Sequence, residues 1–317
     1  MAPGAFPVLD VSDWELIENE VLGQNPKVWL RAPGGTTDRQ DDWLFKPVVT
    51  PPSTGITQGE DWSEKIVSEL AVLLGVPCAE VQLAQRQGER GLISRNVVPA
   101  GWIRILGSDL LRAREPSYVG AYLDGRGVEV RPKGRPGHSP QKIARVLEGC
   151  GPPSGSDELG SAVAVFAGFL VLDAWVANQD RHDQNWAVLR SADMSMQMRL
   201  APSYDHASSL GFNLRDQQRI DWSNRGLSGF VRRARAGRFE HDPSVPTSRR
   251  PTLVDVAREM LELAGRQVET VWMDRLRRIE RSDVESVVAR IPELSVVTAT
   301  FVAEILDLNR GRLLDEC

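Results

Sequence analysis

The chain of 317 residues, 41% of them hydrophobic, is long enough for two modest domains or one bilobal domain with a sizeable core. Its formal net charge of −5 argues against direct nucleic-acid binding through bulk positive charge, although it leaves room for a local basic patch. Cys78, Cys150 and Cys317 are far apart and lack metal-ligand spacing, which argues against a disulfide framework and favours a reducing, cytoplasmic setting.

The sequence carries no signal for secretion or for a membrane. Residues 1–21 lack a basic region followed by an apolar run, so no signal peptide is expected. The most apolar run, residues 162–172, is about half as long as a membrane span and ends at Asp173. We therefore expect a protein without membrane contact.

Within residues 27–47, two short runs of alternating apolar and polar residues flank a turn rich in small residues. This pattern predicts a β-hairpin. Backbone N–H groups at Gly35, Thr36 and Thr37 can approach phosphates if this turn covers a nucleotide, and Lys46 on the second strand can reach them. The signal is weak by itself, because most Gly-Gly turns are only turns and most strand lysines face solvent.

A helix is predicted over residues 60–74, where apolar side chains recur at helical spacing and Gly75 follows as a C-cap. Glu64 and Glu69 are the candidates on this helix for an ion pair with Lys46. At least one of them is expected to face solvent, and the pattern alone leaves the choice open.

Residues 79–84 and 91–98 are predicted to be two further strands that complete a small lobe. Backbone groups around Ser94 and Asn96, near the end of the second strand, are the natural place to bind an adenine edge. The chain then becomes irregular over residues 99–153.

This irregular stretch contains a basic segment, residues 120–138, with Arg126, Arg131, Lys133 and Arg135. A solvated loop is the simpler interpretation of this composition, and a contact to substrate or phosphate is the alternative. A short helix is expected directly after it.

A long helix over residues 157–178 is apolar nearly all round and should form the buried centre of a helical lobe. Asp173 lies inside it, and a buried carboxylate needs a partner, for which Arg181 is one candidate. Two short strands at 186–190 and 196–200 are predicted to form a hairpin.

Asp180, Asn185 and Asp205 carry the strongest chemical signal in the chain. The predicted hairpin begins after Asn185 and ends before Asp205, so it should bring these two residues together. Kinase-type phosphoryl transfer needs one carboxylate on the acceptor hydroxyl, and an amide and a second carboxylate that hold Mg²⁺ on the phosphates of ATP. Each residue alone is more often an ordinary turn residue, but their order and spacing favour this site.

Two neighbours of Asp180 are further candidate catalytic residues, Arg181 and His182. The histidine could orient Asp180 or stabilise transferred charge, or it could be a hydrogen-bonded structural group. Asp183 is expected to face solvent, and Asn178 is expected to help orient the loop.

Two other chemistries fit the sequence less well. No Gly-x-Ser-x-Gly occurs, which argues against a common α/β hydrolase. The four histidines contain no pair at helical metal-ligand spacing, which argues against a histidine metal site.

Residues 206–250 form a polar segment that follows Asp205, at the place where a kinase keeps its substrate-facing segment. A basic, partly disordered loop is an equally weighted interpretation. Among its arginines are Arg225, Arg232, Arg233, Arg235, Arg238, Arg249 and Arg250. Residues 252–314 return to helical patterns and predict a C-terminal bundle.

The motif Asp-Arg-His-x-x-Asn at 180–185, followed by Leu-Ala-Pro-x-Tyr-Asp at 200–205, resembles the HipA-like serine/threonine kinases. These are distant relatives of the phosphatidylinositol 3- and 4-kinases. The resemblance covers roughly residues 27–98 and 160–210. It implies an α+β fold of the bilobal protein-kinase-like type.

By this resemblance, a small β-rich lobe spans residues 1–98 and a mostly helical lobe spans residues 99–317. ATP and Mg²⁺ are expected between them.

The resemblance also implies a role for each candidate residue. Asp180 would be the catalytic base, and Asn185 and Asp205 would be the Mg²⁺ ligands. Lys46 would bind phosphate, and Glu64 would be the helix glutamate that pairs with it.

The expected activity is transfer of the γ-phosphoryl group to a hydroxyl, foremost that of a protein serine or threonine. A small-molecule or lipid-headgroup kinase is the first alternative. A non-catalytic nucleotide-binding regulator is the second, and the intact motif argues against it. The toxin members of the family have an extra N-terminal subdomain, whereas about 26 residues precede the hairpin here, so the resemblance does not decide whether a paired antitoxin and a DNA complex exist. Another partner protein stays open.

Overall fold

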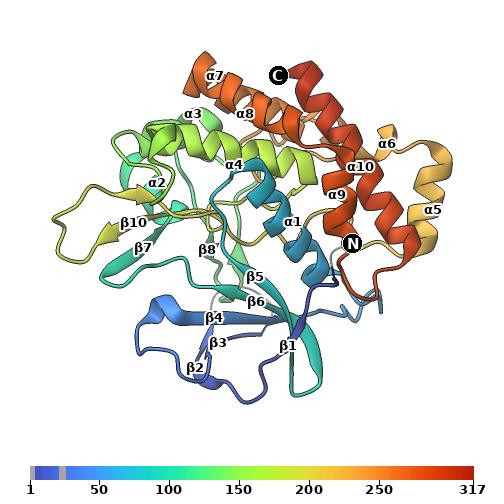
Figure 1. Cartoon of the computed structure of the whole chain (residues 1–317). Coiled ribbons are helices and arrows are strands. Elements are labelled where there is room, and N and C mark those ends of the chain that lie inside the picture. The colour runs from blue at the N-terminus through green and yellow to red at the C-terminus, as the bar shows by residue number, and fades with distance from the viewer. Residues whose placement is uncertain (1–3, 21–25) are drawn as a thin grey trace.

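The computed structural model describes residues 4–20 and 26–317, and its first part is a β-sheet with the strand order β1-β5-β6-β4-β3-β2 (Figure 1). The strands are β1 (Val8–Asp10), β2 (Glu15–Glu20), β3 (Lys27–Arg31), β4 (Asp42–Pro47), β5 (Val81–Arg86) and β6 (Glu89–Arg95). β1 pairs with β5 in parallel, and the other neighbours are antiparallel. The predicted hairpin is β3 and β4, and the two further predicted strands are β5 and β6.

Helix α1 (Glu60–Leu74) has the bounds that the sequence predicts. Gly75 ends it in the left-handed conformation, with φ of 73°, and its N–H donates to the last carbonyl groups of the helix. Ile66 and Leu70 are fully buried, because α1 packs on β5 and β6 on one side and on α9 and α4 on the other. The helix therefore fastens the sheet to the rest of the molecule.

Helix α4 (Ala162–Val176) lies at the centre of the helical part, and nearly all of its side chains are buried, as predicted. It begins later than the predicted residue 157, because the Ser161 side chain accepts a hydrogen bond from the Ala164 N–H and so caps the helix. Residues 157–159 form a separate 3₁₀ turn.

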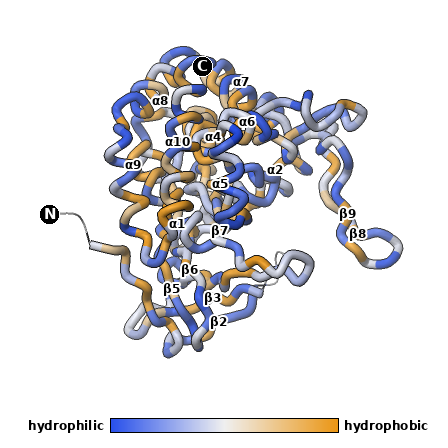
Figure 2. Tube along the Cα trace, turned by 90° about the vertical axis from the view of Figure 1, so that its right-hand side faces the viewer, coloured by the Kyte–Doolittle hydropathy of each residue, from blue (hydrophilic) through white to orange (hydrophobic). Residues whose placement is uncertain are grey.

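The predicted C-terminal bundle is confirmed. Its helices are α7 (Leu253–Ala264), α8 (Arg266–Arg278), α9 (Arg281–Val288) and α10 (Val296–Glu316). α7 and α10 pack directly on α4. Trp272 of α8 is fully buried and donates its indole N–H to the Ala164 carbonyl oxygen. Apolar stretches, orange in Figure 2, accordingly run along α1 and α4 inside the molecule.

Residues 99–153, which the sequence predicts to be irregular, contain regular elements. They are β7 (Trp102–Leu106), α2 (Gly107–Arg114), β8 (Tyr122–Leu123), β9 (Glu129–Val130) and the expected short helix α3 (Pro140–Leu147). β8 and β9 pair into a small ribbon that stands away from the body of the molecule (Figure 2). α2 escapes prediction because its eight residues hold only one short apolar pair, Leu110 and Leu111.

A second sheet, with the order β11-β10-β7, carries the centre of the chemical motif. β10 (Ala187–Ser191) and β11 (Arg199–Leu200) form the predicted hairpin, with Val188 opposite Leu200. Asn185 precedes β10 and Asp205 follows β11, so both leave the same end of this sheet. β7 is the third strand, and the connection over residues 96–101 joins it to the first sheet.

The segment over residues 206–250 contains α5 (Asp216–Arg225) and α6 (Ser228–Val231). Its later part is hydrogen-bonded to the basic segment, since the Glu240 N–H donates to the His138 carbonyl oxygen at 2.7 Å. The two arginine-rich stretches of the sequence therefore lie against each other.

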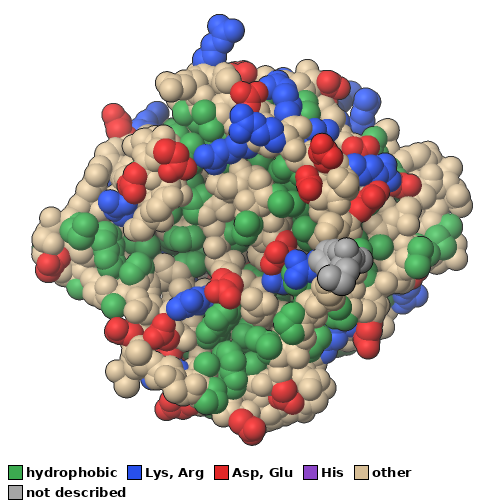
Figure 3. All heavy atoms as spheres, viewed as in Figure 1, with side chains coloured by type: hydrophobic (Ala, Val, Ile, Leu, Met, Phe, Trp, Pro, Cys, Tyr) green, Lys and Arg blue, Asp and Glu red, His purple; other side chains and the backbone are tan. Residues whose placement is uncertain are grey.

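Acidic and basic side chains are interspersed on the face shown in Figure 3. Among the residues described, no helix has both the length and the apolar character needed to cross a bilayer.

Candidate active site

The loop after α4 is shaped by amide side chains on either side of Asp180. The Asn178 side-chain oxygen accepts the Asp180 N–H at 3.0 Å, and its nitrogen donates to Asp173 at 2.8 Å. The Asn185 side-chain nitrogen donates to the Asp180 carbonyl oxygen at 2.8 Å. The bonds from Asn178 to the Asp180 N–H and from Asn185 to the Asp180 carbonyl oxygen fix the backbone of Asp180, which confirms the orienting role predicted for Asn178.

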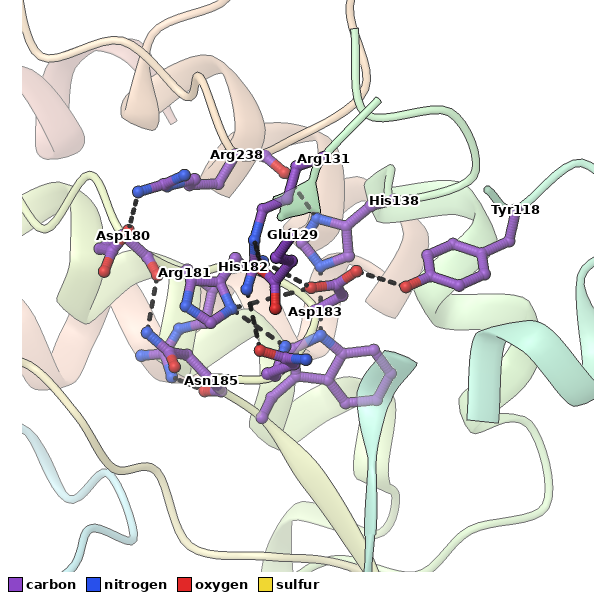
Figure 4. Close-up of polar contacts among 12 residues, drawn as sticks. Tyr118, Glu129, Arg131, His138, Asp180, Arg181, His182, Asp183, Asn185 and Arg238 are labelled. Carbon is purple, nitrogen blue, oxygen red and sulfur yellow. Dashed lines mark hydrogen bonds and ion pairs between the residues drawn. The ribbon is translucent and has the colours of Figure 1, made fainter. Parts of the chain in front are cut away.

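Arg181 turns away from Asp180 into the core (Figure 4). Its guanidinium donates to both carboxylate oxygens of Asp173, at 2.7 and 2.8 Å, and to the Asn185 carbonyl oxygen at 2.8 Å. Asp173 therefore has the predicted partner. The assignment of Arg181 as a catalytic residue is contradicted, because a side chain that is 1% exposed and fully engaged cannot contact an acceptor. His206 is also buried and completes this network. Its Nε2 accepts a hydrogen bond from the Arg181 guanidinium at 3.2 Å and lies 2.7 Å from the Ser203 hydroxyl.

The Asp180 carboxylate lies on the open side of the loop. Arg238, from the segment after α6, forms an ion pair with it at 2.6 Å (Figure 4). Burial raises the pKa of Asp180, and the positive charge of Arg238 offsets part of that rise. A carboxylate with a raised pKa accepts a proton more readily than an ordinary one, as a general base requires.

His182 does not bind the Asp180 side chain. Its Nδ1 accepts the Gln184 N–H at 3.1 Å, and burial together with the charge of Arg131 lowers its pKa to about 3. The imidazole is therefore neutral, and its contacts are those of a structural group. Asp183 is 15% exposed rather than facing solvent, since Arg131 lies 3.3 Å from its carboxylate and the Tyr118 hydroxyl donates to it.

Lys46 lies between two carboxylates from different parts of the chain. Its Nζ is 3.1 Å from Glu64 and 2.8 Å from Asp205. Burial alone would lower the pKa of Lys46, but the carboxylates of Asp205 and Glu64 raise it above its usual value, so the amine stays charged. The choice of Glu64 is confirmed, because Glu69 pairs with Lys65 instead, at 2.6 Å. β4, α1 and the loop after β11 thus meet at one point.

Asn185 and Asp205 offer oxygen atoms to a cation. The bond to Asp180 uses the Asn185 side-chain nitrogen and leaves its oxygen unengaged by the residues described. Asp205 uses one oxygen for Lys46. Burial would raise the pKa of Asp205, but Lys46 lowers it, so the carboxylate is ionised. Carboxylate and amide oxygens suit Mg²⁺, so this pair fits the predicted ion.

The described part of the chain contains no cluster of three or more His, Cys, Asp or Glu side chains that could hold a metal ion. Asn185 and Asp205 stay candidate ligands on the ground of their oxygen atoms alone.

The turn with Gly35, Thr36 and Thr37 lies at the wrong end of its hairpin. It precedes β4 and is separated from it by the 3₁₀ turn of residues 39–41, whereas Lys46 is the fifth residue of that strand. At about 3.3 Å per residue, roughly 13 Å separate the start of β4 from Lys46 along the strand. The prediction that this turn covers the phosphates beside Lys46 is contradicted, and the Thr36 hydroxyl instead donates to Asp41.

Ser94 and Asn96 lie where the first sheet ends. Ser94 is buried on β6, opposite Leu44. The Asn96 side chain donates to the Arg39 carbonyl oxygen at 2.8 Å and accepts the Val98 N–H at 3.1 Å, so it holds the connection between the two sheets. A backbone contact to adenine at this place stays a prediction.

The sequence allows a substrate contact for the two basic segments that contain Arg131, Arg135 and Arg238, but it does not select these three arginines. No spacing signal could have found them, because Arg238 is far from Asp180 in the sequence. All three arginines lie in basic segments that also contain turn residues. This pattern is too general to single out one arginine.

Comparisons with known proteins show the family and the fold. A family model described as the HipA-like C-terminal domain matches residues 20–272. Among solved structures, the chain is similar to the proinflammatory kinase CtkA of Helicobacter pylori, with 15% identity and a TM-score of 0.62, over 98% of this chain and 96% of that one. This likeness shows the fold, which is α+β and bilobal, with a small β-rich lobe and a mostly helical lobe, as predicted.

The HipA of Shewanella oneidensis MR-1, solved with HipB and operator DNA, is matched with 14% identity and a TM-score of 0.47, over 94% of this chain and 66% of that one. No curated protein sequence matches the chain.

Proposed function

The chain belongs to the HipA-like family of kinase-type phosphotransferases, and we propose that it uses ATP and Mg²⁺ to phosphorylate a hydroxyl group, foremost that of a protein serine or threonine. One observation carries this proposal. Lys46 joins Glu64 to Asp205, and Asp205 lies close enough to Asp180 for its charge to raise the pKa of that residue.

Each residue has a distinct task in this proposal. Lys46, held by Glu64, would bind phosphate oxygens. Asn185 and Asp205 would hold Mg²⁺, which when bound neutralises phosphate charge during transfer. Asp180 would accept the proton of the acceptor hydroxyl. Because transfer needs little covalent chemistry from the protein, the main work of these side chains is to position the reactants.

A small-molecule or lipid-headgroup kinase would use the same residues, and the acceptor decides between the two. A non-catalytic regulator would not need Asp180 and its raised pKa. A cytoplasmic setting belongs to the same proposal, on the ground of the cysteine pattern.

Labelling with γ-labelled ATP and Mg²⁺ in a host extract tests the proposal. The wild-type protein is compared with Asp180→Asn, which removes the base but keeps the shape of the side chain. Asp315→Asn is the matched control, because Asp315 is exposed at the end of α10. We expect label on a protein with the wild type and the control, and none with Asp180→Asn.

The other outcomes are equally informative. Label confined to small molecules would replace the protein acceptor with a metabolite. Equal labelling by Asp180→Asn would remove Asp180 from the reaction, and bound ATP without any transfer would favour the regulator.

A further inference from the structure

A pocket beside the Asp180 loop has three arginines in its walls. Arg131, Arg135 and Arg238 line it together with His182 and Asp183. The first two come from the chain between β9 and α3, and the third comes from the segment after α6. The pocket is therefore built where the two basic stretches meet, next to the candidate base.

One of these three arginines forms no direct ion pair with the residues described. Arg131 lies 3.3 Å from Asp183 and 3.0 Å from an exposed glutamate, and Arg238 lies 2.6 Å from Asp180. The guanidinium of Arg135 makes no hydrogen bond or ion pair with any residue that the structure describes. Burial and the neighbouring charges of Arg238 and Arg131 lower the pKa of Arg135, and the carboxylates of Asp183 and Asp180 offset only part of that effect.

The histidines at the pocket add no charge. His138 donates from Nδ1 to the Arg238 carbonyl oxygen at 2.8 Å and accepts the Trp186 indole N–H at Nε2 at 3.1 Å, which defines a neutral ring. Burial lowers the pKa of His138 as well as that of His182. Among the residues that line the pocket, three arginines therefore face one carboxylate, that of Asp183.

The arginines are held by the fold rather than by a loose loop. The His241 N–H donates to the Gly134 carbonyl oxygen at 2.8 Å, and the Glu240 N–H donates to the His138 carbonyl oxygen at 2.7 Å. Gly134 has a φ of 77°, and a Cβ atom there would lie 2.5 Å from the His241 carbonyl oxygen. Only glycine allows this close approach, which brings Arg135 and Arg238 to one pocket.

We propose that this pocket binds an anionic group, phosphate or carboxylate, that the acceptor carries close to its reacting hydroxyl. The inference rests on the proposed phosphotransferase function and names the class of its acceptor. Arg135 holds the anion, and Arg238 turns from Asp180 to the same group. Guanidinium groups suit this task, since they bind phosphate and carboxylate through two parallel hydrogen bonds. The exchange frees the Asp180 carboxylate for the hydroxyl when an acceptor of this class is bound.

Titration calorimetry with inorganic phosphate, without nucleotide, tests the pocket independently of phosphoryl transfer. Arg135→Gln should weaken phosphate binding by about 10- to 100-fold, the loss that one or two charged hydrogen bonds produce. Arg126→Gln is the matched control and should change nothing, because Arg126 lies in the β8–β9 turn and is 85% exposed. Lys46→Gln is titrated as well, because a loss of phosphate binding in this variant would show that phosphate binds at the proposed nucleotide site instead.

Asp180→Asn gives a second, opposite readout. Without the carboxylate, Arg238 is released from its ion pair, so phosphate should bind about two- to fivefold more tightly. The inference is overturned if the wild type binds no phosphate, if Arg135→Gln binds it unchanged, or if Lys46→Gln alone weakens it.

Two further ligands distinguish a protein acceptor from a metabolite as the molecule that carries the anionic group. A peptide with phosphoserine two residues from a serine represents a protein acceptor, and glycerol 3-phosphate represents a metabolite. The tighter ligand identifies the source, provided that Arg135→Gln weakens its binding. Binding that depends on Arg135 in a protein that labels no acceptor would keep the pocket and reject the transfer reaction.

Discussion

At the scale of single residues, two aspartates in one site have different surroundings, which suit the different tasks proposed for them. Asp205 is 2.8 Å from Lys46, which lowers its pKa and keeps it ionised for a cation. Asp180 has a pKa raised by burial, which suits a residue that takes up a proton. Environments that separate the pKa values of two carboxylates are a general way to assign such tasks.

His182 provides a test of the electrostatics around Asp180. Burial and Arg131 lower its pKa to about 3, so the ring should stay neutral as the pH falls from about 8 to 5. An unperturbed imidazole would gain its proton near pH 6.5. We expect the ring proton resonances of His182, assigned by their loss in His182→Gln, to keep constant chemical shifts over this range.

A titration midpoint of His182 near pH 6.5 would contradict the described burial. It would also return to the histidine the role of stabilising transferred charge, which the neutral ring does not support.

The residues that could be predicted are those that a short, ordered motif contains. Asp180, Asn185 and Asp205 follow from local spacing around one helix and one hairpin. Arg181 was assigned wrongly, because sequence spacing does not tell whether a loop side chain points to the open side or into the core. Arg238 could not be found, since only the folded chain brings it to Asp180.

At the scale of elements, helices with a strong apolar pattern were predictable and short ones were not. α1 has the predicted bounds because its apolar stripe and its glycine C-cap agree. α2, with eight residues, has too little pattern to be seen. The prediction that the turn at Gly35 covers the phosphates is wrong, because a hairpin pattern in the sequence does not reveal which end of the hairpin lies near Lys46.

Gly168 in α4 decides how closely α8 approaches. A Cβ atom at this position would lie 2.2 Å from the Trp272 ring. Alanine is the better helix former by about 0.5–1 kcal/mol, but overpacking of a buried contact costs about 1–3 kcal/mol. We therefore expect Gly168→Ala to lower the free energy of unfolding, measured by urea denaturation.

Gly311→Ala in α10 is the control for that substitution. Apart from its chain neighbours and the backbone of its own helix, no heavy atom lies within 4 Å of a Cβ atom at Gly311, so helix propensity alone should act and raise stability slightly. Equal effects of the two substitutions would contradict the described packing of α4 and α8.

At the scale of the whole molecule, the site exists only where the two parts of the chain meet. Lys46 and Glu64 come from the sheet and from α1, whereas Asp180 and Asp205 come from loops of the helical part. The ion pair between Lys46 and Asp205 spans these parts at 2.8 Å. A nucleotide bound at this pair would therefore contact both parts, while an acceptor would approach from the side of Asp180.

The central claim is this division between a nucleotide side and an acceptor side, and calorimetric titration with Mg²⁺-ATP tests it most directly. We expect Asp205→Asn to weaken binding by more than about tenfold, a loss of at least 1.4 kcal/mol. Asp180→Asn should stay within about threefold of the wild type, since Asp180 acts on the acceptor. Unchanged binding by Asp205→Asn, or an equal loss in both variants, would contradict the division.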